Sequence, residues 1–186
     1  MILIVGLGNP GEEFNLTRHN IGFELIDSIH DYFNFPAFKK KFDGFYSKKV
    51  IFDEIVIIFK PQSYMNLSGL PIRKIRDFFK HDDSKNLIVI QDDLDMDFLK
   101  FRVKSRGGHG GHNGIRNIIK FHGEYFYRIK LGIKNELYKN KNIKSENFVL
   151  DKFNFNERKK IECFKKLFNE KFQLIIEKKF SLFNFN

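Results

Sequence analysis

The amino-acid sequence predicts an α/β fold in a single domain, a three-layer α/β/α sandwich around a mixed sheet. Aliphatic runs that suit buried strands alternate with segments of helical periodicity, and one pair of adjacent strand-like runs indicates a hairpin. A length of 186 residues with 42% apolar residues suits one domain with a real core. We therefore assign residues 1–186 to one unit.

The first half of the chain supplies three strands and two helices to this prediction. An aliphatic run at residues 1–5 predicts a central strand, and apolar residues at helical spacing predict a helix over 21–33. Residues 45–52 and 55–59 predict the hairpin. Ser68 is a candidate cap for a helix that carries four apolar residues, Ile72, Ile75, Phe78 and Phe79.

The middle of the chain continues the alternation. Residues 86–90 predict a second buried strand, which is followed at once by the acidic run Asp92–Asp95. Residues 98–104 alternate between polar and apolar side chains, as a strand does. The glycine-rich segment 107–114 opens a short helix, and residues 127–133 predict another strand.

The last third of the chain predicts a loop, a long helix and a loose tail. Residues 134–145 are polar and lysine-rich without periodicity, so we expect a loop or lid over 134–150. Residues 157–179 have an amphipathic pattern typical of a helix, and Cys163 beside its apolar stripe is expected to pack. The tail 180–186 is expected to be loose.

The charge favours a polyanionic partner. The chain has 33 Lys and Arg against 23 Asp and Glu, a net charge of +10, although an AT-rich coding bias would also enrich lysine. No apolar run is long enough to span a membrane, and one cysteine excludes an internal disulfide and a multi-thiolate metal site. A cytoplasmic protein is expected.

The run Gly6–Gly11 matches the spacing of a dinucleotide-binding loop, G-x-G-x-x-G. That loop needs its last glycine inside the helix that it opens and an acidic residue at the end of the next strand. Here Pro10 precedes Gly11, and the next periodic helix starts nearly ten residues later. We expect instead a tight loop that exposes Asn9 and presents His19.

His19 and Asp92 are the candidates for chemistry. His19 precedes the first predicted helix, and Asp92 ends an aliphatic strand, where α/β folds gather their sites. A carboxylate that pairs with a histidine sets its tautomer and raises its basicity, so such a pair can activate water directly. Taken singly, His19 also suits a structural histidine, and the acidic run suits a solvated turn.

Two other sites remain open from the residues alone. The acidic run, helped by His19, His109 or His112, could hold a divalent cation, although it lacks the spacing of a calcium loop. The glycine run could form a nest for a phosphate or a turn beside which a substrate chain passes. Asn66 and Asn113 offer donors and acceptors that suit a peptide unit, whereas Asn113 also suits a helix cap.

Four motifs together resemble those of the bacterial peptidyl-tRNA hydrolase family. They occur in family order over roughly residues 1–150: Gly6–Gly11 with Thr17–Phe23, Lys60-Pro61 with Tyr64–Gly69, Asp92–Asp95, and Gly107–Gly114. The resemblance implies a twisted mixed sheet between helices and a monomer without metal or organic cofactor. The implied reaction is hydrolysis of the ester between peptide and tRNA.

The resemblance also implies residue roles. His19 would be the base for water, and Asp92 would orient and polarise it. The peptide side of the substrate would be held by residues of the first, second and fourth motifs: Asn9, Phe14, Tyr64, Met65, Asn66 and Asn113. Phe14 stands where the family usually has tyrosine, which removes a hydroxyl, and Gln91 stands where histidine is common.

The tRNA end would need cations at one side of the cleft. Lys104 and Arg128 are the preferred tRNA contacts because they lie at predicted strand ends near the glycine segment. The other candidates are Arg18, Lys100, Arg102, Arg106, Lys130, Lys134 and the lysines of 139–144. Two competing functions remain: an RNA-binding module of the same fold without turnover, and a metal-dependent phosphoesterase built on Asp92, Asp93 and Asp95.

Overall fold

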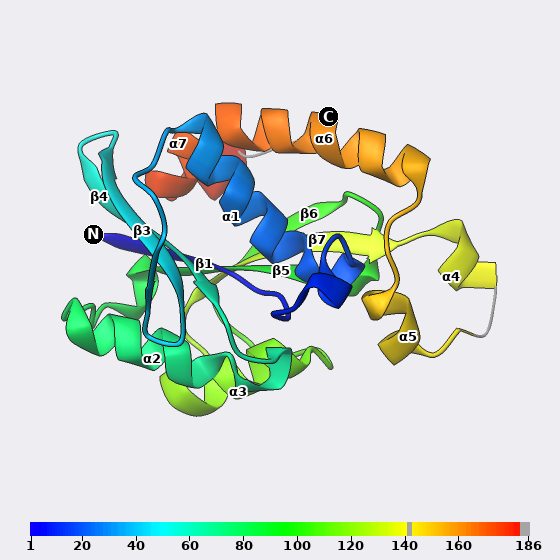
Figure 1. The fold of residues 1–186 in the computed structure, drawn as a ribbon, viewed down its shortest axis with the longest axis horizontal. Helices are drawn as coiled ribbons and strands as arrows, with labels where there is room; N and C mark the ends of the chain where they lie inside the picture. The colour runs from blue at the N-terminus through cyan, green and yellow to red at the C-terminus, as the bar shows by residue number, and fades with distance from the viewer. Residues whose placement is uncertain (141–142, 183–186) are drawn as a thin grey trace.

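The computed structural model describes residues 1–140 and 143–182. Its described residues form a seven-stranded mixed sheet in the order β2-β3-β4-β1-β5-β7-β6 (Figure 1). Strands β4, β1, β5 and β7 run parallel to one another, whereas β2, β3 and β6 pair antiparallel with their neighbours. The strands are β1 (Ile2–Gly6), β2 (Lys39–Lys41), β3 (Gly44–Ile51), β4 (Glu54–Pro61), β5 (Leu87–Asp97), β6 (Phe101–Lys104) and β7 (Tyr127–Lys134).

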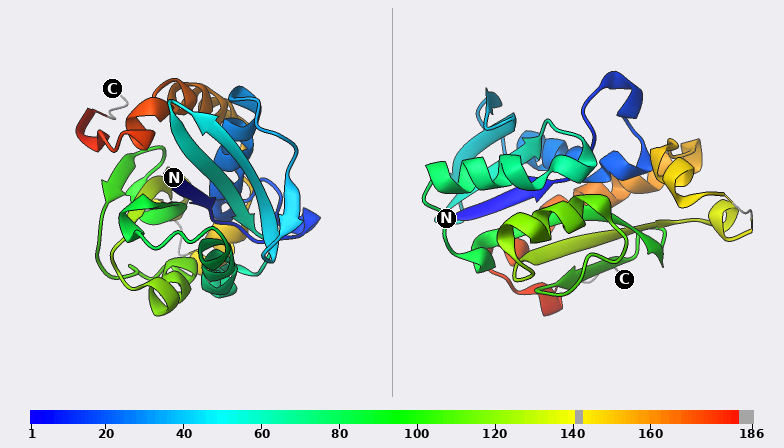
Figure 2. Two further views of the ribbon diagram at one scale, coloured as in Figure 1. Left: turned by 90° about the vertical axis from the view of Figure 1, so that its left-hand side faces the viewer. Right: turned by 90° about the horizontal axis from the view of Figure 1, so that it is seen from below.

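Helices cover both faces of this sheet, which confirms the predicted three-layer sandwich (Figures 1 and 2). Helices α1 and α6 lie on one face, and α2 and α3 lie on the other. The helices are α1 (Ile21–Tyr32), α2 (Gly69–Phe78), α3 (Asn113–His122), α4 (Glu136–Asn140), α5 (Ser145–Leu150), α6 (Phe155–Glu170) and α7 (Phe172–Ile176). Short 3₁₀ turns include η1 (Glu12–Phe14), η2 (Arg18–Asn20), η3 (Met65–Leu67) and η5 (Phe180–Leu182).

The alternation of side chains along β1 divides the core into two parts. Ile2 and Ile4 pack in the layer with α1 and α6, whereas Leu3 and Val5 pack in the layer with α2 and α3. All four are almost fully buried because β1 lies between β4 and β5 in the middle of the sheet. This is the period of two expected for a strand that is covered on both faces.

Two glycines bring α1 against the end of β1. A Cβ atom at Gly6 would lie 2.2 Å from the Gly22 carbonyl oxygen, and one at Gly22 would lie 2.4 Å from the Leu7 nitrogen. Any larger residue would push the helix away, so this crossing requires glycine on both sides. The close approach places η2, which carries His19, over the carboxyl end of the sheet.

The structure corrects three of the predicted elements. The strand expected at 86–90 continues to Asp97, so the acidic run lies in β5 and is not a turn. The segment 134–150 contains α4 and α5 instead of a loop. The helix expected over 157–179 begins at Phe155 and is interrupted at Lys171, where the backbone leaves helical geometry.

Smaller corrections concern single residues. Ser68 precedes α2, but its hydroxyl donates to the Met65 carbonyl and caps nothing. Cys163 is exposed and does not pack in the core. In the tail that was expected to be loose, residues 180–182 form a 3₁₀ turn whose Phe180 ring lies 4.7 Å from that of Tyr127; residues 183–186 lie outside the described part.

Candidate active site

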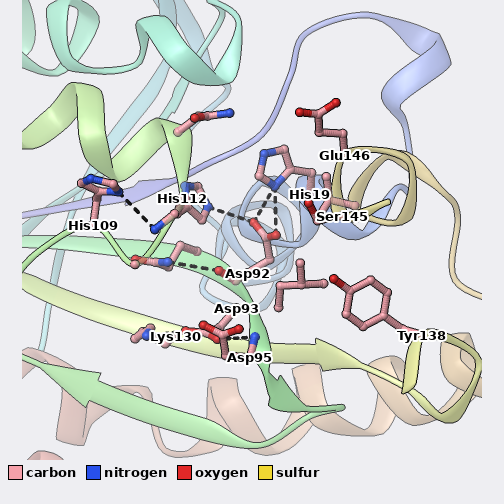
Figure 3. A pocket seen from close by; sticks show the side chains of 16 residues that line it. His19, Asp92, Asp93, Asp95, His109, His112, Lys130, Tyr138, Ser145 and Glu146 are labelled. Carbon is pink, nitrogen blue, oxygen red and sulfur yellow. Dashed lines mark hydrogen bonds and ion pairs between the residues drawn. The ribbon is translucent and has the colours of Figure 1, made fainter. Parts of the chain in front are cut away.

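His19 and Asp92 meet at the carboxyl end of two neighbouring parallel strands. Gly6 of β1 lies beside Ile90 of β5, so the loop after β1 and the end of the aliphatic part of β5 share one edge. The Nδ1 atom of His19 is 2.8 Å and 2.9 Å from the two carboxylate oxygens of Asp92 (Figure 3). The pairing expected from the sequence is present.

His112 completes this arrangement, and sequence reasoning assigned it only to a metal site. It occupies the N-cap of α3, where its Nδ1 accepts hydrogen bonds from the amides of Gly114 and Ile115. Because Nδ1 accepts, the ring proton lies on Nε2, which donates to Asp92 Oδ1 over 3.0 Å. The available signal was a histidine within the glycine-rich segment 107–114, directly before the helix that this segment opens.

Burial and the neighbouring charges shift the pKa values of His19 and Asp92 in opposite directions. Burial of Asp92 opposes its ionisation, but the two histidines and their hydrogen bonds hold the pKa of this carboxyl well below its usual range. Burial of His19 opposes its charged form, yet the charge and hydrogen bonds of Asp92 raise the pKa of His19 above its ordinary value of 6.5. An ionised carboxylate therefore supports His19.

A cavity of about 370 Å³ opens beside the pair (Figure 3). His19, Asp92, His112 and Asn113 line it from the sheet edge and α3, and Tyr138 lines it from α4. Because His19 donates from Nδ1 to Asp92, its Nε2 carries a lone pair, and in the described part of the chain no group hydrogen-bonds to that atom. The arrangement offers a base to a water molecule in the cavity.

The three predicted asparagines lie in different surroundings. Asn9 is buried and not exposed as expected, because its Oδ1 accepts from the Met65 amide and its backbone exchanges two hydrogen bonds with Asn20. Asn66 lies exposed in η3, and Asn113 is exposed as the first residue of α3. Only Asn113 lines the cavity of His19, while the bond from Asn9 to Met65 ties the first motif to the second.

Phe14, Tyr64 and Met65 lie next to these asparagines. The rings of Phe14 and Tyr64 meet edge to face with 6.5 Å between their centroids, so the aromatic contact exists without a hydroxyl on Phe14. Tyr64 is 59% exposed, whereas Met65 is buried against the start of α3. A Cβ atom at Gly114 would lie 2.6 Å from the Met65 sulfur, so this glycine allows η3 and α3 to touch.

Comparison with known proteins identifies the family. The family model described as peptidyl-tRNA hydrolase matches residues 3–184. A peptidyl-tRNA hydrolase of Clostridium novyi is 45% identical over 159 residues, which cover 85% of this chain and 82% of the relative. A peptidyl-tRNA hydrolase of Fusobacterium nucleatum is 44% identical over 162 residues, which cover 87% of this chain and 82% of the relative. The chain belongs to the peptidyl-tRNA hydrolase family.

Solved structures of peptidyl-tRNA hydrolases share the fold. A crystal structure of the enzyme from Acinetobacter baumannii superimposes with a TM-score of 0.87 at 31% identity, covering 97% of this chain and 91% of that one. A complex of a peptidyl-tRNA hydrolase with N-propanol gives a TM-score of 0.86 at 32% identity, covering 95% and 89%. The predicted fold class and the predicted enzyme class, an ester hydrolase, are both confirmed.

The cations proposed for this hydrolase divide into exposed and buried groups. Arg128 is 3% exposed, and its guanidinium donates to the carbonyls of Gly107, Gly108 and Glu124, so it anchors the glycine segment and does not face solvent. Arg18 is also buried. The exposed cations in and beside β6 are Lys100, Arg102, Lys104 and Arg106. Lys141, another candidate, lies outside the described residues.

The histidine and carboxylate atoms of His19, Asp92 and His112 lie within 4.8 Å of one another and could surround a metal ion. A histidine that binds a metal through Nε2 usually donates its Nδ1 proton to an acceptor. His112 does the reverse, because its Nδ1 accepts two amide hydrogens. Its tautomer suits a hydrogen-bonded triad and does not suit a metal ligand.

Several groups of the acidic run and of the glycine segment are already hydrogen-bonded within the protein. Asp93 pairs with Lys130 and accepts the amides of Asp95 and Met96. In the glycine segment, the Gly111 amide donates to His109 Nδ1, while the amides that begin α3 donate to His112. These bonds favour a structural turn over a phosphate nest at this position.

Proposed function

We propose that His19 is the general base and Asp92 the residue that orients it in the hydrolysis of peptidyl-tRNA. His19 Nε2 takes a proton from water, and the water oxygen attacks the carbonyl carbon of the ester. The bond to the ribose oxygen of tRNA then breaks, the proton passes to that oxygen, and the peptide leaves as a carboxylic acid. The observation that carries this proposal is the contact of His19 Nδ1 with both oxygens of a buried Asp92.

Asp92 and His112 prepare His19 for this step. Once His19 has gained the proton, its positive charge lies against the ionised carboxylate of Asp92, which is 2% exposed, and this contact stabilises the imidazolium. His112 holds the same carboxylate from α3, so Asp92 cannot rotate away without breaking a second hydrogen bond. His112 acts as a positioning residue in this scheme.

The peptide end of the substrate would be held by groups around the start of α3. We assign Asn113, exposed in the cavity, to the oxygen that becomes negative during attack, because an amide N–H aimed at that oxygen stabilises it. Asn9, Asn66, Phe14, Tyr64 and Met65 complete the proposed peptide side. The tie between Asn9 and the Met65 amide supports this grouping.

The tRNA end would lie along the exposed cations of β6, with Lys104 as the preferred contact. Arg128 would contribute by holding the glycine segment in place, since its guanidinium already binds that segment.

We also propose that the enzyme acts as a monomer in the cytoplasm. In the described ranges, no helix is long and apolar enough to cross a membrane.

The test of the mechanism is cleavage of peptidyl-tRNA by wild type and His19→Ala. Removal of a general base costs about 10²–10⁴ in rate, so the variant should lose most of its kcat while its thermal unfolding stays near wild type. His30→Ala, which changes a histidine bonded to Asp31 and Pro36 away from the cavity, is the control and should retain full activity. An unchanged rate in His19→Ala would contradict the mechanism, and tRNA binding without cleavage by wild type would favour an RNA-binding module.

A further inference from the structure

The 3₁₀ turn η3 carries part of the proposed peptide side, and asparagines from two other segments hold its backbone. At the start of η3, the Met65 amide donates to Asn9 Oδ1 over 2.8 Å. Just after its end, the amide of Gly69, the first residue of α2, donates to Asn117 Oδ1 on α3 over 2.7 Å. Asn117 therefore does at the end of η3 what Asn9 does at its beginning.

The Gly69 amide is one of the groups that a helix leaves without a partner of its own. The first N–H groups of an α-helix have no carbonyl one turn earlier, and a side chain at the N-cap usually accepts one of them. Ser68 occupies the N-cap of α2, but its hydroxyl donates to the Met65 carbonyl. Because Gly69 is buried, Asn117 takes the place of this missing cap from a neighbouring helix.

A second residue of α3 binds the same glycine. His122 Nε2 donates to the Gly69 carbonyl over 3.1 Å, and His122 Nδ1 accepts from Arg76 Nη1 over 2.9 Å. Partial burial and the charge of Arg76 lower the pKa of His122 to about 4, so the ring is neutral near pH 7. Both the N–H and the carbonyl of Gly69 are therefore tied to α3.

These bonds set the distance between η3 and the start of α3. Helices α2 and α3 lie side by side on one face of the sheet (Figures 1 and 2), and a Cβ atom at Gly69 would lie only 2.7 Å from the Asn117 carbonyl oxygen. Asn117 follows Asn113 by one helical turn. No hydrogen bond holds the side chain of Asn66 within the part of the chain that the structure describes, so the backbone of η3 alone places it.

We propose that Asn117 is a positioning residue of this hydrolase, because it fixes η3 relative to Asn113. His122 supports it by holding the carbonyl of the same glycine. The inference rests on the proposed function, which takes Asn66 and Asn113 to contact the substrate. Among the described residues that line the cavity of His19, neither Asn117 nor His122 occurs, so both act through η3. A misplacement of about 1 Å in a substrate-positioning group can cost on the order of 10²-fold.

The experiment measures peptidyl-tRNA cleavage and binding of uncharged tRNA by wild type, Asn117→Ala and Asn117→Asp. The alanine variant should raise KM about tenfold, which corresponds to ~1.4 kcal/mol, with little change in kcat, because the groups at the reacting atoms stay in place. Its Kd for uncharged tRNA should equal that of wild type. Asn117→Asp keeps an acceptor for the Gly69 amide and should restore the wild-type KM.

Asn169→Ala is the matched control. Asn169 is also a buried asparagine that joins two helices, since its Nδ2 on α6 donates to the carbonyl and hydroxyl oxygens of Ser28 on α1. Both alanine variants should lower the melting temperature by a few degrees, because each loses a hydrogen bond between helices. Only Asn117→Ala should change KM, which separates a loss of position from a loss of stability.

The opposite results overturn the inference. An unchanged KM in Asn117→Ala, or a KM raised as much in Asn117→Asp or Asn169→Ala, would leave Asn117 with a structural role only. A weaker Kd for uncharged tRNA in Asn117→Ala would assign its effect to RNA binding instead. Asn117→Leu, which fills a similar volume without an acceptor, repeats the comparison should Asn117→Ala fold poorly. Wild-type protein that cleaves no peptidyl-tRNA would refute the proposed function itself, whereas an unchanged KM in the variant of a cleaving enzyme refutes only the positioning role.

Discussion

Asp92 accepts hydrogen bonds from two imidazoles that the chain fixes in different ways. His112 is held by the amides that begin α3, so it can only donate to the carboxylate. Among the described residues, the His19 ring hydrogen-bonds to the carboxylate alone and keeps its Nε2 for the substrate. One histidine therefore serves as a support and the other as a base, although both touch the same oxygen atom.

The pKa of His19 predicts the pH dependence of the reaction. The base must be neutral, and Asp92 raises the pKa of His19 above 6.5, so kcat/KM should fall as the pH drops and its acid limb should lie above pH 6.5. In Asp92→Asn the burial of His19 remains without the carboxylate charge. The acid limb should then move to lower pH while the plateau falls, as measured by kcat/KM against pH.

The exposed Asp95→Asn, at the edge of the same cavity, provides the control and should keep the wild-type limb. A wild-type limb below pH 6.5, or a limb that does not move in Asp92→Asn, would contradict the role of Asp92.

Single residues differ in how far the sequence reveals their roles. His19 and Asp92 follow aliphatic strands, so their approach could be expected. The roles of His112, Arg18 and Arg128 depend on which backbone groups lie next to them, and nothing in the local sequence states that. An arginine side chain can bind a phosphate or a loop carbonyl. For Arg128 the packing around it shows that the partners are loop carbonyls, those of Gly107 and Gly108.

At the level of elements, the junction of α5 and α6 supports the turn that carries the base. Arg18, beside His19, donates to the Phe148 carbonyl and to Glu157, and its guanidinium lies 4.1 Å from the Phe148 ring. Glu157 also closes the capping box of α6 with Asn154. The base is therefore tied to the carboxyl-terminal third of the chain through its neighbour.

Arg18→Met should destabilise the protein by about 3–5 kcal/mol, because it leaves the buried Glu157 carboxylate without its cation. Arg73→Met is the matched control: its ion pair with Asp77 is exposed and 3.7 Å long, so the loss should stay below about 1 kcal/mol. Urea denaturation of both variants measures the free energies of unfolding. Equal losses would show that the Arg18 contacts contribute no more than a surface pair.

Elements with a continuous apolar pattern could be predicted, and those whose structure depends on distant contacts could not. The strand 1–5, the hairpin and the helix after Asn20 follow from local periodicity. Helix α5 has six residues and few apolar side chains, one of which, Phe148, is buried under Arg18. So short a segment does not show a helical repeat of apolar residues, and the helix could not be predicted from the sequence pattern. The extension of β5 through the acidic run needs β7 beside it, since Asp92 and Asp93 pair with Leu131 and Gly132.

At the scale of the whole molecule, the cationic side chains are distributed over surface and core. Arg18 and Arg128 are buried and stabilise loops, so they do not contribute to a nucleic-acid surface. The exposed part includes the row along the edge strand β6 with Lys104 at its end. The count of 33 Lys and Arg therefore overstates the number of cations that tRNA can meet.

Binding of uncharged tRNA should weaken with salt, because contacts to phosphates release counterions. We expect a loss of about tenfold or more between 50 and 200 mM salt, and a slope of log K against log salt that is smaller by about one in Lys104→Gln. Lys166→Gln, an exposed lysine on α6, should leave the slope unchanged. A salt-independent Kd, or the same slope in all three proteins, would contradict a phosphate contact at Lys104.

The hydrogen bond between His19 and Asp92 joins positions 73 residues apart, and β5 is held between β1 and β7. A growing chain on the ribosome therefore has no assembled site until the strand ending at Lys134 has emerged. No amino-terminal fragment made before that point can cleave an ester by this route. The enzyme that cleaves peptidyl-tRNA is therefore itself inert while the first 134 residues of its own chain are being made.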